Sequence, residues 1–206
     1  MDFIEGLLVS KDKDKIFVVV DRLTKYAHFM GIKKTDSGKQ IAEILCKNIY
    51  KLHGFPKIIV SDRDTKFTSN FWKEFCKQIV ITLNMSSTHH PQLDGQTEVV
   101  NKCLEPYLRS FVTDKQNTWL QWLHLAEWWY NSTYHTSAKM THFQALYGYG
   151  PTRWKALVQG DAKVPTIKIQ LEENQRVMQV LEDHLTMAQN HMKHQADSIE
   201  QKESLK

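Results

Sequence analysis

The run IFVVV at residues 16–20 is the feature that most limits how this 206-residue chain folds. Its β-branched and aromatic residues are continuous instead of alternating with polar ones, which is typical of a strand buried on both faces. The segments DFIEGLLV (2–9) and YAHFMGI (26–32) read as neighbouring strands, and the charged stretch SKDKDK (10–15) reads as a hairpin turn. We therefore expect a sheet whose central strand is covered on both sides.

The segments after these strands alternate between helices and short strands. The predicted elements are a helix between a Ser37–Gln40 capping box and Gly54, a strand KIIV (57–60), a helix TSNFWKEFCKQ (68–78), a strand IVITL (79–83), and helices over about 96–113 and 119–134. Thr118 and Gln121 form a second potential capping box. This order predicts an α/β fold in which helices flank both faces of a five-stranded mixed sheet.

A Gly- and Pro-containing segment, GYGPTRWKALVQGDAKVP (148–165), marks a boundary in the chain. We expect a core over residues 1–150, a linker over 151–165 and a helical extension over 166–206. The extension carries apolar residues at a seven-residue spacing that is interrupted at Asn174 and Gln195, which indicates an amphipathic helix or a coiled coil.

Charge and cysteine content narrow the class of protein. Residues 166–206 hold five Lys and Arg against seven Asp and Glu, so the net charge of +4 rests on residues 1–165. A mildly basic body is compatible with a polyanionic partner. The three cysteines form no CxxC pair, which gives no sign of a zinc knuckle, and no apolar run approaches the ~20 residues of a membrane span.

Three carboxylates stand where a site is expected. Asp62 follows the strand KIIV, Asp2 lies in the first strand, and Glu98 is placed in the first turn of a predicted helix. Taken singly, each acid also fits a cap, a salt bridge or a solvated turn. If they converge, two unit charges about 4 Å apart repel by roughly 4 kcal/mol at an effective dielectric constant near 20, so a cation must separate them. Oxygen ligands favour Mg²⁺ or Mn²⁺, and two such ions assist phosphoryl transfer.

Several stretches together resemble a known family. They are MDFIEGL, VVVDRLTKYAHF, IIVSDRDTKFTSNFWKEF, HHPQLDGQTEVVNKCLE and KMTHFQALYG, in order over about residues 1–150. They are similar to the integrase core of gypsy-type long-terminal-repeat retrotransposons, relatives of retroviral integrases. The resemblance implies an RNase H-like fold and the acidic triad of DDE transferases at Asp2, Asp62 and Glu98, with 35 residues between the last two. It also implies Mg²⁺ or Mn²⁺, two ions in all, as the cofactor.

The resemblance further implies DNA integration: water trims the 3′ end of the element, and the freed hydroxyl attacks target DNA. Asn101, Lys102, Gln92 and Pro91 are then the candidate DNA contacts. The implied partners are element-end and target DNA and further copies of the chain. The implied location is the nucleus, with a cytoplasmic particle as a second place. Two alternatives stay open, a catalytically inactive, host-retained copy that only binds DNA or protein, and an RNase H-type nuclease.

Some positions depart from the family pattern. His89 stands where an aromatic residue is usual, Leu93 replaces a Thr, and His142 replaces a Pro. The chain begins one residue before Asp2, so we expect a truncated copy whose first strand frays and whose strand transfer is weak. Asp21, at the end of a central strand, is the rival candidate for the first catalytic acid.

Overall fold

The computed structural model describes residues 1–85, 100–101, 104, 108, 116–135, 138–152, 169 and 176. The chain divides into two compact units, Met1–Gly150 and Pro151–Lys206. In the second unit only four residues are described, of which Ile169 and Arg176 are helical. The linker at 151–165 and the extension at 166–206 therefore stay predictions, and most of both lies outside the described residues.

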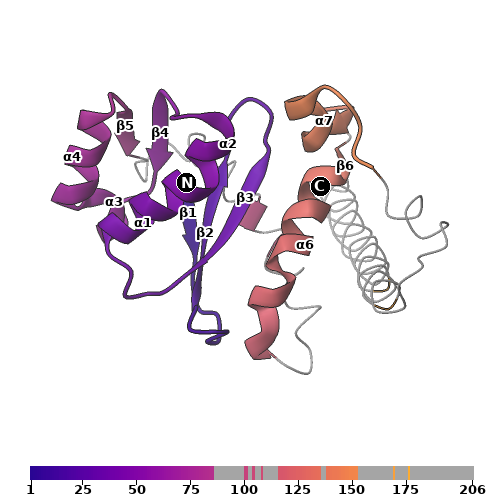
Figure 1. Ribbon diagram of the computed structural model, residues 1–206, viewed down its shortest axis with the longest axis horizontal. Helices are drawn as coiled ribbons and strands as arrows, with labels where there is room; N and C mark the ends of the chain where they lie inside the picture. The colour runs from indigo at the N-terminus through magenta and orange to yellow at the C-terminus, as the bar shows by residue number, and fades with distance from the viewer. Residues whose placement is uncertain are drawn as a thin grey trace, which may run out of the picture. The chain divides into compact units, whose positions relative to one another are not determined.

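The predicted central strand is confirmed. Strands β1 (Asp2–Ile4), β2 (Lys15–Val20) and β3 (Ala27–Ile32) form an antiparallel sheet in the order β1-β2-β3, with Asp2 opposite Val18 (Figure 1). The middle of β2 is fully buried, because its continuous apolar run leaves no polar side to face water.

Two further strands pair in parallel beside β1. Strand β4 (Ile58–Ser61) pairs with β5 (Thr82–Met85). The ammonium group of Met1 donates a hydrogen bond to the carbonyl oxygen of Val60 at 2.7 Å, which links the start of β1 to β4. Five strands are thus present in two hydrogen-bonded sheets, β1-β2-β3 and β4-β5, which are linked by this contact.

The fifth strand begins later than the sequence suggested. A strand at 79–83 is wrong, because Ile79 still belongs to a helix end and donates its backbone N–H to the carbonyl of Phe75. Val80 then adopts a left-handed conformation with φ of 60°, which turns the chain before Thr82. Hydrophobicity alone did not distinguish this apolar turn from the strand that follows it.

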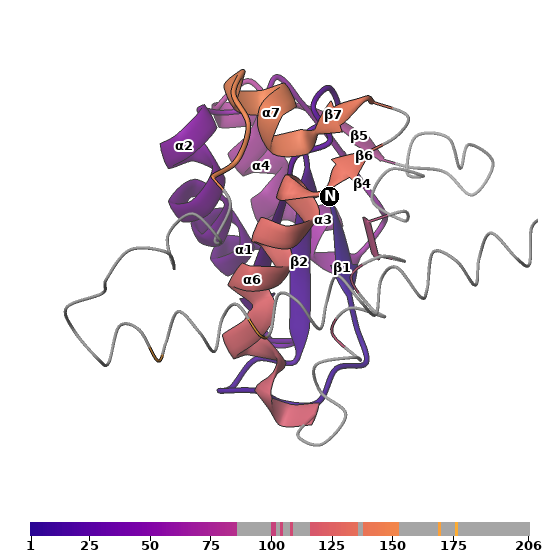
Figure 2. The ribbon, with the colours of Figure 1, turned by 90° about the vertical axis from the view of Figure 1, so that its right-hand side faces the viewer.

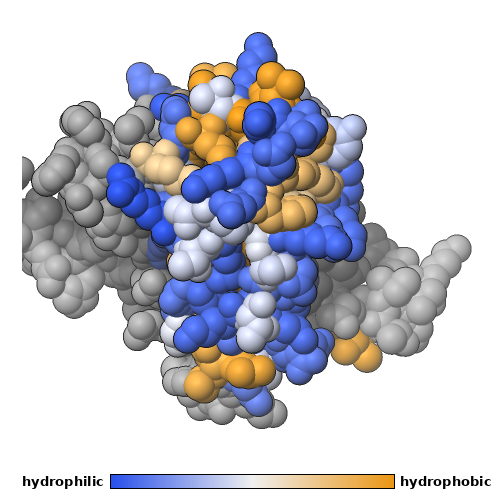
Figure 3. Space-filling model, turned by 90° about the vertical axis from the view of Figure 1, so that its left-hand side faces the viewer, coloured by the Kyte–Doolittle hydropathy of each residue, from blue (hydrophilic) through white to orange (hydrophobic). Residues whose placement is uncertain are grey.

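Helices cover one side of the strands (Figure 1). They are α1 (Gly38–Leu45), the π-helical turn η1 (Cys46–Tyr50), α2 (Lys51–His53), α3 (Thr65–Thr68) and α4 (Asn70–Gln78). The predicted capping box of Ser37 and Gln40 is confirmed, and the chain leaves α2 at Gly54 with φ of 75°. Under these helices Phe3 stacks on Phe67 at 4.7 Å in an aromatic core. The face of the molecule that carries α4 is largely hydrophilic, with small separate apolar patches (Figure 3).

A long helix lies along the free edge of β3. It is α6 (Trp119–Ser132), which follows a 3₁₀ turn η2 (Gln116–Thr118) and precedes β6 (Tyr134–His135), β7 (Met140–Thr141) and α7 (His142–Tyr147) (Figure 2). The side chain of Asn131, fully buried, accepts from the N–H of Ala27 and donates to its carbonyl, at 2.9 and 2.8 Å. None of the described helices combines the length and the apolar character that crossing a bilayer requires.

The second capping box is wrong. Thr118 makes no side-chain cap hydrogen bond, because the 3₁₀ turn before α6 gives it φ of −109° and ψ of 3°, away from the extended conformation of an N-cap.

Candidate active site

Strand β1 presents Asp2 with both carboxylate oxygens engaged. Oδ1 accepts the backbone N–H of Phe3 at 2.7 Å, and Oδ2 accepts the side-chain amide of Asn101 at 2.7 Å. Together with the Met1–Val60 hydrogen bond, these contacts hold the first residues of the chain in place. These contacts oppose fraying of the first strand, whereas the expectation of weak strand transfer stays a prediction.

Asp62 directly follows the last residue of β4, as the strand pattern predicted. Its Oδ1 accepts the backbone N–H of Asp64 at 3.1 Å, which fixes the turn that leads into α3. Since Met1 is bonded to Val60, the segment that carries Asp2 and the segment that carries Asp62 are neighbours. The segments that carry Asp2 and Asp62, two of the three predicted acids, thus lie next to each other, and the catalytic role of both acids stays a prediction.

Asn101 connects a helical segment to this junction. Val100, Asn101, Leu104 and Leu108 are helical, and the three apolar residues are buried at positions four apart. Asn101 reaches Asp2 across 99 positions of sequence. The sequence had suggested Asn101 as a DNA contact, which stays a prediction; its bond to Asp2 was not foreseen, because no local pattern reports which strand a helix will meet.

The remaining predicted residues lie outside the described part of the chain. They are the third acid, Glu98, and the DNA contacts Pro91, Gln92 and Lys102. Within the described residues, no three His, Cys, Asp or Glu side chains gather into a metal-binding group. The roles of all these residues stay predictions.

Asp2 and Asp62 nevertheless suit a hard divalent cation. Both offer carboxylate oxygens, the ligand type that Mg²⁺ and Mn²⁺ prefer. The side-chain oxygen of Asn101 is buried beside Asp2 and meets no hydrogen-bond donor among the described residues. An acceptor left in that state is destabilising by about 1–3 kcal/mol, and a hydrated cation would satisfy it.

The rival acid, Asp21, is occupied by its own turn. Its Oδ2 accepts both the backbone N–H and the hydroxyl of Thr24, each at 2.7 Å. Burial alone would raise the pKa of Asp21, but these hydrogen bonds outweigh it and the pKa is lowered. A hairpin turn between β2 and β3 therefore accounts for this carboxylate.

Two buried lysines near β1 gave no signal in the sequence. Lys15 pairs with Glu5, and Lys66 lies 3.8 Å from Asp64; their ammonium groups lie 5.8 and 5.2 Å from the ring centre of Phe3. Burial opposes the charge of Lys15, yet its hydrogen bond to Glu5 prevails and raises its pKa. Each of the two lysines is paired with an acidic side chain, so we interpret both lysines as structural.

The fold defined by these elements is the RNase H-like α/β fold of integrase catalytic cores. A chain of the simian T-cell lymphotropic virus intasome in complex with PP2A regulatory subunit B56 gamma superposes with a TM-score of 0.60 and 19% identity, over 74% of this chain and 55% of that one. The HTLV-2 integrase catalytic core domain in complex with magnesium, in its trimeric form, gives 0.54 and 20%, over 70% and 93%.

The sequence comparisons agree with the fold. Residues 1–91 match the family model of the integrase core domain. The Transposon Tf2-3 and Tf2-4 polyproteins of Schizosaccharomyces pombe are each 32% identical over 189 residues, which is 90% of this chain. The chain spans 14% of the length of these polyproteins.

Proposed function

We propose that this chain is the catalytic core of a gypsy-type retrotransposon integrase, which trims the 3′ ends of element DNA and joins them to target DNA. The integrase-core match and the likeness to transposon polyproteins support the class. The observation that carries the proposal within the chain is the hydrogen bond between Asn101 and Asp2. This hydrogen bond joins Asn101, which lies three positions after Glu98, to the strand that carries Asp2. That strand lies beside the turn that carries Asp62.

In this proposal each residue of the site has a defined task. Asp2, Asp62 and Glu98 hold Mg²⁺ or Mn²⁺, with two ions in the complete site. Ions held there would supply Lewis acidity to the attacking water or 3′-hydroxyl and would offset the charge of the phosphodiester. Asn101 and the N–H of Phe3 orient Asp2, and the N–H of Asp64 orients Asp62. No covalent bond to the protein is required.

The partners follow from the same chemistry. Pro91, Gln92, Asn101 and Lys102 would contact the end of the element DNA, and the positive charge of residues 1–165 would favour the phosphate backbone. Further copies of the chain would assemble on the paired DNA ends. The reaction on chromosomal DNA would place the protein in the nucleus, after passage through a cytoplasmic particle.

The direct test is an assay for joining of a labelled DNA end in Mg²⁺ or Mn²⁺. We expect Asp62→Asn and Asp2→Asn each to reduce joining by about a hundredfold or more, since misplacing a reacting group by 1 Å already has that effect. Asp12→Asn is the matched control, because Asp12 lies in the exposed hairpin turn and its side chain is 83% exposed. It should join DNA at the unmodified rate.

The same assay separates the alternatives. Salt-sensitive DNA binding without joining by the unmodified chain would indicate the inactive remnant. Cutting of an RNA–DNA hybrid without joining would indicate the nuclease. If joining survives Asp2→Asn but is lost in Asp21→Asn, the assignment of the first acid to Asp2 is refuted.

A further inference from the structure

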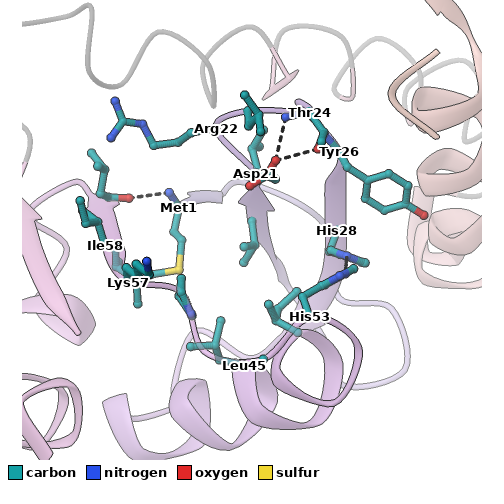
Figure 4. A pocket seen from close by; sticks show the side chains of 18 of the residues that line it. Met1, Asp21, Arg22, Thr24, Tyr26, His28, Leu45, His53, Lys57 and Ile58 are labelled. Atoms are coloured by element: carbon teal, nitrogen blue, oxygen red, sulfur yellow. Dashed lines mark hydrogen bonds between the residues drawn. The ribbon is translucent and has the colours of Figure 1, made fainter. Parts of the chain in front are cut away.

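Two histidines from separate elements face each other at the rim of a pocket. His28 lies in β3 and His53 ends α2, and their Nε2 atoms are 3.0 Å apart (Figure 4). Two lone pairs would repel at this distance, so either a proton or a cation must lie between the nitrogens. The pocket beside them has a volume of about 500 Å³ and is lined by β2, β4, the β2–β3 turn and the helices α1 and α2.

Glu127 of α6 determines which nitrogen of His28 is available. The Nδ1 of His28 lies 3.0 Å from Oε1 of Glu127, and Oε2 of the same carboxylate accepts the backbone N–H of Phe29 at 2.8 Å. An ionised carboxylate only accepts hydrogen bonds, so Nδ1 carries the proton. The Nε2 of neutral His28 therefore presents its lone pair toward His53. A carboxylate behind a histidine is the usual support of a metal-binding imidazole.

We propose that His28 and His53 form a binding site for a transition-metal dication of the Zn²⁺ class, with Glu127 as the supporting carboxylate. Zn–N bonds of about 2.05 Å place neighbouring ligand nitrogens of a tetrahedral site about 3.3 Å apart. The observed separation needs to open by only a few tenths of an ångström. This inference does not rest on the proposed function.

A negative charge lies close to the two histidines. The negative charge of Asp21 on the same pocket wall also attracts a dication. Water from the pocket would complete the coordination of the ion. Imidazole ligands distinguish this site from the carboxylates of Asp2 and Asp62, which suit Mg²⁺.

The test is a calorimetric titration of the full chain with Zn²⁺. We expect binding that His53→Gln weakens at least tenfold and that Glu127→Gln weakens by about 10- to 100-fold. His53 is exposed, so its replacement removes a ligand without opening the core. His124→Gln is the matched control, because His124 is an exposed histidine of α6. It should retain the unmodified affinity, and Mg²⁺ at the same concentration should not bind here.

A second measurement needs no substitution at the site. In NMR spectra of the unmodified chain, Zn²⁺ should shift the ring resonances of His28 and His53 and leave those of His124 in place. Equal Zn²⁺ affinity in the unmodified and His53→Gln proteins would refute the proposal. So would unchanged His28 resonances at saturating Zn²⁺, which would mean that the 3.0 Å contact is a hydrogen bond alone.

Discussion

At the scale of single residues, Asn101 is the polar one among the four described residues of its helical segment. Val100, Leu104 and Leu108 are at most 3% exposed, whereas the amide of Asn101 turns to Asp2. A contact of this kind fixes where a carboxylate points, which matters more for catalysis than its contribution to stability.

Replacing Asn101 should therefore change the metal dependence of DNA joining more than it changes the stability of the fold. We expect Asn101→Ala to lower DNA joining by about 10- to 100-fold and to raise the Mn²⁺ concentration for half-maximal activity. Asn70→Ala, an exposed residue at the start of α4, is the control. A Mn²⁺ dependence identical to that of the unmodified chain would show that Asn101 does not position Asp2.

At the scale of elements, α7 is attached to the β2–β3 turn by a buried histidine. His142 is 5% exposed, its Nδ1 lies 3.0 Å from the carbonyl of Thr24, and its ring stacks on His135 at 3.8 Å. Burial, together with the nearby His135 and Lys25, lowers the pKa of His142 to about 4, although the contact with Thr24 opposes the shift.

This histidine makes stability depend on pH. Between about pH 6.5 and 4 the unfolded chain binds a proton that folded His142 does not, so the free energy of unfolding falls as the pH falls. The slope is at most about 1.4 kcal/mol per pH unit for this group. Urea unfolding at pH 7, 6 and 5 should show the loss, and His142→Gln should reduce it, whereas His124→Gln should not. An unchanged slope in His142→Gln would exclude this origin.

Elements with strong local signals were predictable, and elements set by packing were not. The Ser37–Gln40 capping box and Gly54 bound the first helical stretch as expected, because both signals act within a few residues. The start of β5 was misplaced, since burial of Ile81 looks the same in a turn as in a strand. The position of Asp62 after β4 was predictable from the strand pattern, but the partners of Asp2 and His28 come from α-helical residues about 100 positions away.

At the scale of the whole molecule, contacts distant in sequence join α6 to the sheet and to the segment that follows β1. Asn131 bonds both backbone groups of Ala27, and the indole of Trp119 donates to the carbonyl of Leu8 at 2.7 Å. We expect Asn131→Ala to reduce the free energy of unfolding by about 2–4 kcal/mol, because it leaves two buried backbone groups unpaired. Urea denaturation measures this, with the exposed Gln121→Ala as control. Equal midpoints for the two variants would contradict the assignment.

The way α6 lies along β3 also bears on self-association. β3 is the outer strand of its sheet, and Asn131 and Glu127 occupy the backbone groups of Ala27 and Phe29 that would otherwise face another molecule. Uncovered strand edges pair with one another and seed aggregates. A protein lacking both side chains, Glu127→Ala with Asn131→Ala, should scatter light on gentle warming before Gln121→Ala does. Helix α6, whose Glu127 contacts His28, thus also prevents the edge of β3 from pairing with a strand of another molecule.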